Sequence, residues 1–451
     1  MGSFDSNTVF VLGAGFTKAF LPDAPVLVDD FEGERLANQY AAFTYESAIL
    51  QEELRSHDHQ PGQLNLERLM TRLAGGMPYD YAAGSAPVFA AMLADLKLVF
   101  LRRLAKAKSG SPRDSGALRL FAEHVVAKKC TCITFNYDDL LDEALWRSSP
   151  TLDPRVSWSP DWGYGFPCRM SEACVRQLSI RPAHRDSLLL LKMHGSVNWR
   201  IPIGTARPYG IESIRHHESW YWQGHEHDKV SLESLDPFFV QEPMIVPPVL
   251  SKVELNEQPV LQLTWRHAID SLENASRVIF IGYSLPRTDI AAETLFREGV
   301  LGDCRDRITI VDYAINDSVR DEKRNIIESS YGRIFRMSEL RDIHLDGAAH
   351  WITNALTTWY FDSNGAPVAY EGNGLLWTRH GSFLGHRWKD EVWGHEFVGR
   401  IVDNRLLRPA DRPNDRPVKY SEPDFNISPD DPANSTPICL PTGWSDLVAN
   451  A

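Results

Sequence analysis

The stretch TVFVLGAGFT, residues 8–17, decides the expected fold. Its first five residues are β-branched or apolar and predict a short buried strand, which Gly13 and Gly15 end in a tight turn. We expect a helix to follow. Such a turn lets a ligand approach the backbone closely, and its N–H groups together with the Thr17 hydroxyl suit a pyrophosphate. The alternative is an ordinary turn between strand and helix.

Four later segments repeat this pattern, each a short apolar run that ends on small or polar residues. They are residues 130–135, 188–193, 278–281 and 308–311. Helical patterns at 290–300 and 317–329 supply connecting layers. Buried strands that alternate with helices predict an α/β fold with a doubly wound, parallel, Rossmann-like sheet, whose ligand crevice lies beyond the carboxyl ends of the strands.

The rest of the chain predicts a helical insertion and a C-terminal extension. Residues from about 31 to 121 carry apolar side chains three and four positions apart, which indicates helices, as at Leu64–Met70 and Met92–Val99. We therefore expect one α/β domain over residues 1–360 that includes this insertion, followed by an extension over residues 361–451.

The extension has two parts that differ in composition. Residues 409–437 hold seven prolines among acidic and polar positions, which favours an extended arm over a packed core. The part before them contains aromatic side chains that form either a small core or a surface for another chain. These are Trp377, Phe383, Trp388, Trp393 and Phe397.

Composition and charge narrow the classes of partner. With 43% hydrophobic and 24% charged residues, the 451-residue chain has the composition of a globular protein with a sizeable core. Its formal net charge of −13 repels phosphate backbones and anionic membranes, so we expect no direct nucleic-acid binding and no membrane partner. No apolar run reaches the roughly 18–20 residues that span a bilayer, and the N-terminus lacks a signal-peptide pattern, so we expect a cytoplasmic protein.

The cysteines and histidines predict no metal site. None of the six cysteines forms a CxxC pair, and Cys130 and Cys132, two apart on a strand, are expected to be buried. Histidines and acidic residues between His216 and Asp228 bracket an aromatic cluster, and they either bind a transition metal or form a solvated hairpin. Because these residues lack one firm ligand register, we expect the hairpin.

Polar residues follow the second and third predicted strands. Asn136 suits a ribose hydroxyl or a water, and the Asp138 carboxylate favours positive charge that develops on a sugar, although Asp138 equally suits a cap on the following helix. His194 ends the third strand, and a histidine there can accept a proton or be structural. Gly195, which follows it, allows close packing of a ligand.

Four motifs together resemble the ordered motifs of Sir2-like domains. They are Gly13-Ala14-Gly15-Phe16-Thr17, Thr134-Phe135-Asn136-Tyr137-Asp138, Lys192-Met193-His194-Gly195-Ser196 and Gly282-Tyr283-Ser284-Leu285. The resemblance extends over about residues 7–345. It is to the bacterial branch found in anti-phage defence proteins, and Ile245-Val246-Pro247-Pro248 is also similar to a segment of that branch.

The resemblance implies that NAD is the substrate. It makes His194 the catalytic base and places Asn136 and Asp138 in the pocket for the nicotinamide ribose. It implies that the pyrophosphate is bound by Gly13, Ala14, Gly15, Phe16 and Thr17. Further contacts to NAD are implied for Gly195, Ser196, Gly282, Ser284 and Asp312, with Asp312 near the adenosine end.

Two departures from Sir2-like deacylases limit what the resemblance implies. Those enzymes carry two cysteine pairs on a zinc module after the histidine motif, and this chain has no such pairs. Val197-Asn198-Trp199 also does not resemble their peptide-binding strand. Both differences remove the apparatus for an acyl-lysine substrate and leave the NAD site, so we expect no zinc.

These observations predict an NAD hydrolase that releases nicotinamide and ADP-ribose. The resemblance implies a triggered, NAD-depleting effector of bacterial anti-phage defence, acting as a homo-oligomer or with a partner protein. A HerA-like ATPase suits it better than a short Argonaute, because the extension is short for an Argonaute-associated region. Two alternatives stay open: an NAD-dependent protein deacylase or ADP-ribosyltransferase, and a sensor that binds NAD or ADP-ribose without turnover.

Overall fold

A computed structural model of the chain describes residues 5–25, 38–43, 46, 48–49, 52, 71–72, 85–110, 115–149, 157–166, 169–170, 188–200, 212–213, 243–246, 258–286, 289–301, 306–337, 340–410, 423, 425, 427–440, 442 and 444–447. The chain divides into two compact units. The α/β unit comprises Phe4–Ser111 and Lys128–Ala348. The barrel unit comprises Met1–Ser3, Pro112–Ala127 and Ala349–Ala451.

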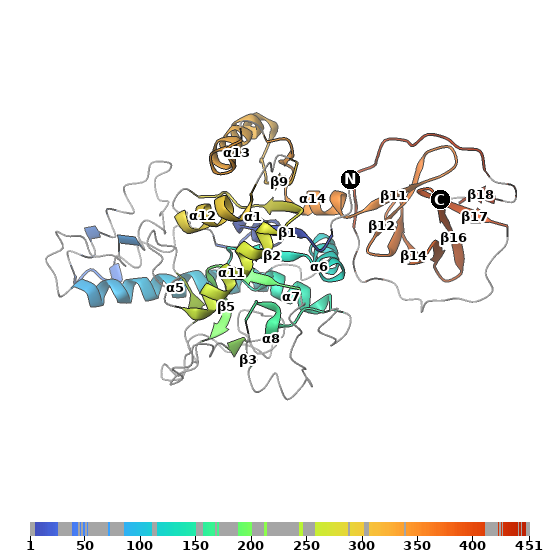
Figure 1. The fold of residues 1–451 in the computed structure, drawn as a ribbon. Coiled ribbons are helices and arrows are strands. Elements are labelled where there is room, and N and C mark those ends of the chain that lie inside the picture. The colour runs from blue at the N-terminus through green and yellow to red at the C-terminus, as the bar shows by residue number, and fades with distance from the viewer. Residues whose placement is uncertain are drawn as a thin grey trace. The chain divides into compact units, whose positions relative to one another are not determined.

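A six-stranded parallel sheet forms the centre of the α/β unit (Figure 1). From edge to edge its strands are β10 (Ile343–His344), β9 (Ile308–Val311), β8 (Arg277–Ile281), β1 (Thr8–Leu12), β2 (Thr131–Thr134) and β4 (Leu190–Lys192). Every pairing between them is parallel. Numbered along the chain, this is the 3-2-1-4-5-6 strand order of dinucleotide-binding sheets. Successive strands are added on one side of β1 up to β4 and then on its other side from β8 onward, so the switch point lies between β1 and β8. The predicted parallel, Rossmann-like sheet is therefore confirmed.

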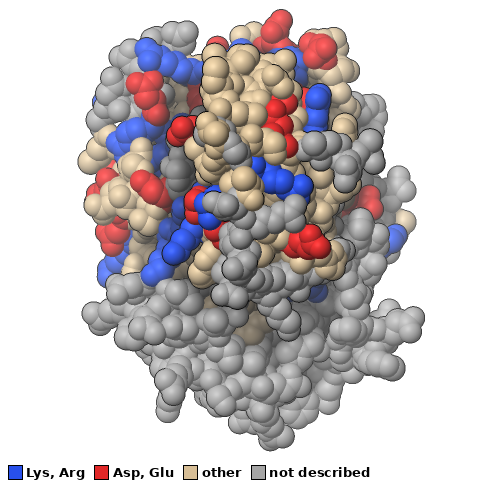
Figure 2. All heavy atoms as spheres, turned by 90° about the vertical axis from the view of Figure 1, so that its right-hand side faces the viewer, with Lys and Arg blue, Asp and Glu red and all other residues tan. Residues whose placement is uncertain are grey.

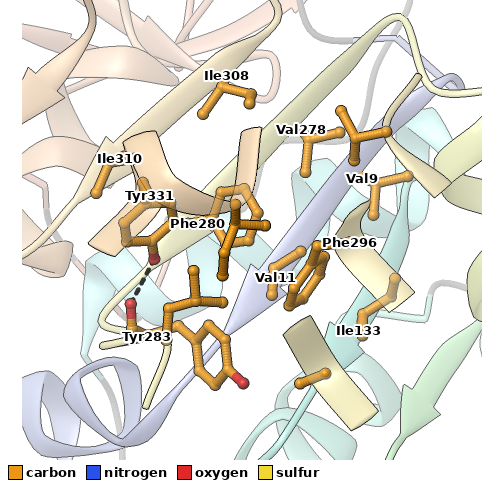
Figure 3. Packing of buried hydrophobic residues seen from close by; sticks show 14 of the residues in the cluster. Val9, Val11, Ile133, Val278, Phe280, Tyr283, Phe296, Ile308, Ile310 and Tyr331 are labelled. Atoms are coloured by element: carbon orange, nitrogen blue, oxygen red, sulfur yellow. Dashed lines mark hydrogen bonds between the residues drawn. The ribbon is translucent and has the colours of Figure 1, made fainter. Parts of the chain in front are cut away.

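Side chains from one face of this sheet pack on three helices (Figure 3). The helices are α11 (Pro259–Glu273), α12 (Ile290–Gly299) and α13 (Arg320–Phe335). Phe280 of β8 packs edge-on against Phe296 of α12 and Tyr331 of α13, with ring centroids 5.1 and 5.0 Å away. All five residues of β1 and all four of β9 are buried. This burial on both faces explains why the strands appear in the sequence as continuous apolar runs.

Of the two helices predicted between strands, the first matches its predicted range closely and the second matches in part. The helix predicted at 290–300 is α12, and its bounds differ by one residue. The segment predicted at 317–329 begins as a 3-10 turn, Asp317–Val319, and continues as α13 to Phe335. Within the described residues, no helix is long and apolar enough to cross a membrane.

The insertion and the remaining short helices complete the α/β unit. The long helix α5 (Ser85–Gly110) contains the predicted segment Met92–Val99, whereas the prediction at Leu64–Met70 lies outside the described residues. The other helices described here are α1 (Ala14–Phe20), α7 (Leu140–Arg147) and α8 (Pro160–Gly163).

A second, smaller sheet contains the strand that follows directly after β4. Its four strands lie in the order β3 (Arg169–Met170), β6 (Glu212–Ser213), β5 (Gly195–Arg200) and β7 (Pro243–Ile245). Only Met193 and His194 separate β4 from β5, so the chain passes from the large sheet to the small one at the predicted histidine. The histidine cluster at 216–228 lies outside the described residues.

The barrel unit was not predicted as a barrel. Its strands are β11 (Thr358–Phe361), β12 (Pro367–Gly372), β13 (Leu375–Thr378), β14 (Phe383–Trp388), β15 (Glu391–Trp393), β16 (Phe397–Val402), β17 (Arg405–Pro409) and β18 (Trp444–Asp446). Each pairs with the next in antiparallel fashion, and a further parallel pairing between Phe361 and Arg405 joins β11 to β17 and closes the sheet. Two helices, α6 (Gly116–Lys128) and α14 (Ala348–Ala355), fall mainly in this unit.

The aromatic residues of the extension divide between core and surface. Trp377, Trp393 and Phe397 are buried, as expected for a small core, whereas Trp388 is 43% exposed. The described residues 427–440 of the proline-rich part form no helix or strand. The arm is nevertheless packed: Phe425 and Ile427 are buried, and the Ser435 N–H donates to the Gly365 carbonyl at 2.7 Å. Their burial was not predicted.

The surface of the barrel unit mixes both signs of charge (Figure 2). Basic side chains there pair with acidic ones, as Arg379 does with Asp431 at 2.5 Å and Arg387 with Glu371 at 2.8 Å. Among the described residues in this view, basic and acidic groups are interspersed with uncharged ones.

Candidate active site

Three glycines meet where the strand order of the large sheet reverses. Gly13 and Gly15 follow β1, and Gly282 follows the neighbouring strand β8. A Cβ atom on Gly13 would lie 2.5 Å from the Gly282 oxygen, and one on Gly282 would lie 2.3 Å from the Phe16 nitrogen. Gly282 also has a φ of +61°. Only glycine therefore fits where these two turns touch.

The contacts of the glycine turn qualify its predicted role in phosphate binding. The N–H group of Gly15 donates to Gly282 at 2.9 Å, that of Gly13 to Ile281 at 3.0 Å, and that of Phe16 to Gly13 at 2.9 Å. These three donors are thus satisfied within the protein. Ala14 and Gly15 are exposed, so the backbone of the turn remains accessible. Phosphate binding by residues 13–17 stays a prediction.

Three polar side chains beyond β1 and β2 form a chain of hydrogen bonds, which we call the strand-end cluster. The Asn136 amide nitrogen donates to the Thr17 hydroxyl at 2.9 Å, and that hydroxyl donates to Asp138 Oδ2 at 2.6 Å. Asn136 and Asp138 are half-buried, and Thr17 is buried. The structure therefore brings together three of the predicted site residues through direct contacts.

The orientation of the Asn136 amide is set by its surroundings. Its nitrogen also donates to the Gly13 carbonyl at 2.7 Å, and a carbonyl can only accept, so the nitrogen must point there. The amide oxygen Oδ1 accepts no hydrogen bond from any residue that the structure describes. It is thus an oriented acceptor, suited to a ligand hydroxyl or a water.

Asp138 also contacts the start of α7, whose N-cap residue is Asp139, in addition to its bond with Thr17. Its Oδ1 accepts from the N–H of Leu140, the first residue of α7, at 3.1 Å. Its backbone carbonyl accepts from Lys192 Nζ at 2.6 Å. With both carboxylate oxygens engaged, Asp138 is held rigidly beside Thr17, where its charge can act on a bound ligand without direct contact.

His194 lies at the carboxyl end of β4 and is 7% exposed. Its Nε2 lies 3.4 Å from Oδ2 of Asp289, the N-cap residue of α12. The Phe135 ring meets the imidazole edge-on at a centroid distance of 5.3 Å, and the Trp265 ring lies at 6.5 Å. Asp289 was not predicted from the sequence, although an aspartate before an apolar helical pattern is a cap signal.

Gly195 and Ser196 have contacts within the protein that explain their residue types. Gly195 has a φ of +79°, and a Cβ there would lie 2.1 Å from the Met244 oxygen of β7. A glycine is thus required here because the backbone of β7 lies against Gly195. Ser196 is fully buried and donates to Asn198 Oδ1 at 2.5 Å. For both residues, contact with NAD stays a prediction.

A second polar group, the buried cluster, contacts the strand-end cluster through Lys192 and was not predicted. It consists of Lys192, Asp142, Tyr164, Asn198 and Ser196. Lys192 Nζ lies 2.9 Å from Asp142 Oδ2, and Tyr164 and Asn198 donate to Asp142 Oδ1. Neither charged side chain is more than 2% exposed. A lysine inside the apolar run at 188–193 was the available sequence signal, since a buried lysine needs a buried acid.

The last two predicted residues, Ser284 and Asp312, follow the carboxyl ends of β8 and β9 in the large sheet. Ser284 follows β8 and is exposed. Asp312 follows β9, and its Oδ2 lies 2.9 Å from Lys323 Nζ of α13, while its Oδ1 accepts from the Tyr313 N–H at 2.7 Å. The structure thus shows Asp312 in an ion pair. Its predicted place near the adenosine end remains a prediction.

The described residues contain no group of three or more His, Cys, Asp or Glu side chains that could hold a metal ion. Cys130 and Cys132 are buried, as expected. Burial is the main cause that raises the pKa of the Cys130 thiol to about 12, and it raises that of Cys132 well above its ordinary value. Both thiols are therefore protonated at neutral pH.

Residues 131–298 match the family model described as the SIR2-like domain. This segment includes Asn136, Asp138, His194 and Asp289, whereas β1 and its glycine turn precede it. The fold and the site together define a Rossmann-type α/β protein with a SIR2-like segment. No curated protein matches the chain.

Solved structures with some similarity to the chain include several Sir2 proteins. One, from work on the mechanism and regulation of Sir2 enzymes, is 13% identical, with 78% of this chain and 90% of that chain covered and a TM-score of 0.35. A Sir2 homologue in complex with NAD is 14% identical, with 76% and 84% covered and a TM-score of 0.33. A Sir2 homologue variant bound to 2′-O-acetyl-ADP-ribose is 12% identical, with 76% and 88% covered and a TM-score of 0.34.

Proposed function

We propose that the chain is an NAD hydrolase that releases nicotinamide and ADP-ribose. The observation that carries the proposal is the strand-end cluster, in which Thr17 and Asp138 fix Asn136 with an accepting oxygen at the ligand-binding edge of a dinucleotide-type sheet. The match of residues 131–298 to the SIR2-like domain supports the choice of NAD.

The described residues fit NAD in part. Asn136 Oδ1 suits a ribose hydroxyl or the attacking water, and the exposed Ala14, Gly15 and Ser284 are accessible to phosphates. The N–H groups of Gly13, Gly15 and Phe16 are engaged within the protein, so phosphate contacts would depend on other groups of the two turns.

The proposed reaction breaks the bond between nicotinamide and C1′ of the ribose. Nicotinamide leaves with the electron pair of that bond, positive charge develops on the sugar, and water adds at C1′. Asn136 orients the ribose and the water, the Asp138 carboxylate favours the developing positive charge, and His194 takes the proton that the water loses. The products are nicotinamide, ADP-ribose and a proton.

We further propose that the activity serves as a triggered, NAD-depleting effector in bacterial anti-phage defence. An enzyme that consumes NAD without control would harm its own cell. We therefore propose that homo-oligomerisation or a partner protein controls the activity. A HerA-like ATPase is the preferred candidate partner, and a short Argonaute is the second. Reconstitution with such partners is therefore part of the test.

The test measures nicotinamide release from NAD, with and without candidate partners and an acetyl-lysine peptide. We expect release without peptide and its loss in Asn136→Ala and His194→Ala, while Asn274→Ala, the same change at the exposed end of α11, retains it. Melting temperatures show that the variants are folded. Turnover that requires the peptide would instead indicate a deacylase, and binding without turnover a sensor.

A further inference from the structure

Asp289 makes two separate contacts with its two carboxylate oxygens. Oδ1 accepts from the Ala292 N–H at 3.2 Å and so caps α12. Oδ2 lies 3.4 Å from His194 Nε2, at the end of a different strand. The side chain is 4% exposed, and 95 residues of sequence separate it from the histidine that it faces.

The cap alone does not account for an aspartate at this position. Asparagine and serine cap helices about as well, and neither brings a charge. A buried carboxylate costs free energy unless a positive charge or hydrogen-bond donors compensate it. The Ala292 N–H is one such donor, and the imidazole of His194 adds a positive charge when it is protonated.

We propose that Asp289 is a positioning residue for His194, an inference that rests on the proposed NAD hydrolysis. The carboxylate holds the imidazole in place and stabilises the positive charge that forms when the ring accepts the proton of the attacking water. Asp289 itself neither gains nor loses a proton. Its effect is confined to the transition state and the later steps of the reaction, because only there is the ring charged.

The described aromatic rings beside the imidazole carry no charge. The rings of Phe135 and Trp265 are uncharged. Tyr137 lies with its ring centroid 6.3 Å from that of His194, and its hydroxyl donates to the Val246 carbonyl at 2.8 Å. Among these described groups, the carboxylate is the one that carries a charge able to respond to the imidazolium.

Asp289→Asn separates the two roles, because asparagine keeps the size and the cap but removes the charge. We expect an unchanged melting temperature and an unchanged KM for NAD, with kcat lowered about 10- to 100-fold, a part of what a general base contributes. Asp289→Glu, which restores the charge, should recover part of kcat. Asp430→Asn, next to His350 in the barrel unit, should leave kcat unchanged.

The same change in the His194→Ala background should have no further effect on kcat, since the two residues act as a unit. A wild-type kcat in Asp289→Asn, an equal loss in the His194→Ala background, or a parallel fall in melting temperature would each overturn the proposal.

A second readout does not depend on turnover. NMR titration of the His194 ring should show a lower midpoint in Asp289→Asn than in the wild type, because the nearby negative charge favours the protonated ring. If the wild type releases no nicotinamide but the midpoint shifts, the proposed function fails while the pair is supported. An unchanged midpoint rejects the pair itself.

Discussion

The strand-end cluster and the buried cluster contain the same kinds of side chain but differ in how completely they are satisfied. In the strand-end cluster, Asn136 is half-buried and keeps an acceptor that no described residue uses. In the buried cluster, the Asn198 side chain has both an acceptor bond and donor bonds, to Ser196, Asp142 and Tyr164. The first arrangement can serve a ligand, whereas the second can serve only the fold.

The two clusters meet at one residue. Lys192 Nζ donates to the Asp138 carbonyl and also pairs with Asp142. The buried cluster therefore supports the backbone that carries the strand-end cluster. Substitutions that affect stability should map to one cluster and those that affect catalysis to the other, and single variants in each cluster test that division.

The largest effect is expected from Lys192→Met. Removing the lysine leaves the Asp142 carboxylate buried without its counter-charge, which costs about 3–5 kcal/mol of unfolding free energy. Lys323→Met is the matched control, because Lys323 also lies 2.9 Å from an aspartate but is 33% exposed. The control should lose less than about 1 kcal/mol in urea unfolding. Equal losses in both variants would remove the distinction between buried and exposed pairs.

The same substitution in each cluster gives the sharpest comparison. Asn136→Ala should lower kcat for NAD hydrolysis about 100-fold, which is near 2.7 kcal/mol, with a small loss of stability. Asn198→Ala should cost about 1–3 kcal/mol of stability, since it leaves buried partners unsatisfied, while the kcat of the folded protein is retained. Denaturant unfolding and NAD hydrolysis are measured on both variants. If both variants lose mainly activity, or both lose mainly stability, the two clusters do not differ in function.

Thr17→Val should have a smaller effect. Valine keeps the shape of threonine but removes the hydroxyl that links Asn136 to Asp138, so the Asn136 amide is less firmly oriented. We expect a loss of about 1 kcal/mol of stability and a fall in kcat of about tenfold, with Thr17→Ser near the wild type. A valine variant with full activity would show that the link to Asp138 does not matter for turnover.

The sequence predicts the positions of the strand ends better than it predicts what those ends contact. Short apolar runs that end on polar residues are local signals, and a parallel sheet necessarily brings their carboxyl ends to one edge. Thr17, Asn136 and Asp138 were therefore placed together correctly. The pairing of Asp289 with His194 depends instead on where α12 begins relative to β4, which no local pattern states.

The barrel was missed for a related reason. Its strands are three to six residues long, and several mix buried and exposed positions without strict alternation, as the strand Phe383–Trp388 does. Closure also depends on a single pairing, Phe361 with Arg405, between segments far apart in the chain. Neither the short, mixed strands nor the closing pair produces a periodic pattern of apolar residues that could be recognised in the sequence.

The smallest effect is expected at a half-exposed pair outside both clusters. A hydrogen bond from His344, 2.8 Å away, is the main cause that lowers the pKa of Asp342 below its ordinary value of 3.8, and Thr309 donates to the other oxygen. A lowered folded-state pKa stabilises the protein above the unfolded value, and this contribution is lost as the pH falls below about 3.8.

Asp342→Asn should accordingly lower the free energy of unfolding slightly at pH 7, by less than about 1 kcal/mol because the pair is partly solvated. The difference from the wild type should shrink towards zero below pH 3.8. A difference that grew in acid would reverse the sign of the assigned shift. A loss at pH 7 as large as that of Lys192→Met would show that burial does not set the energetic scale of polar pairs in this unit.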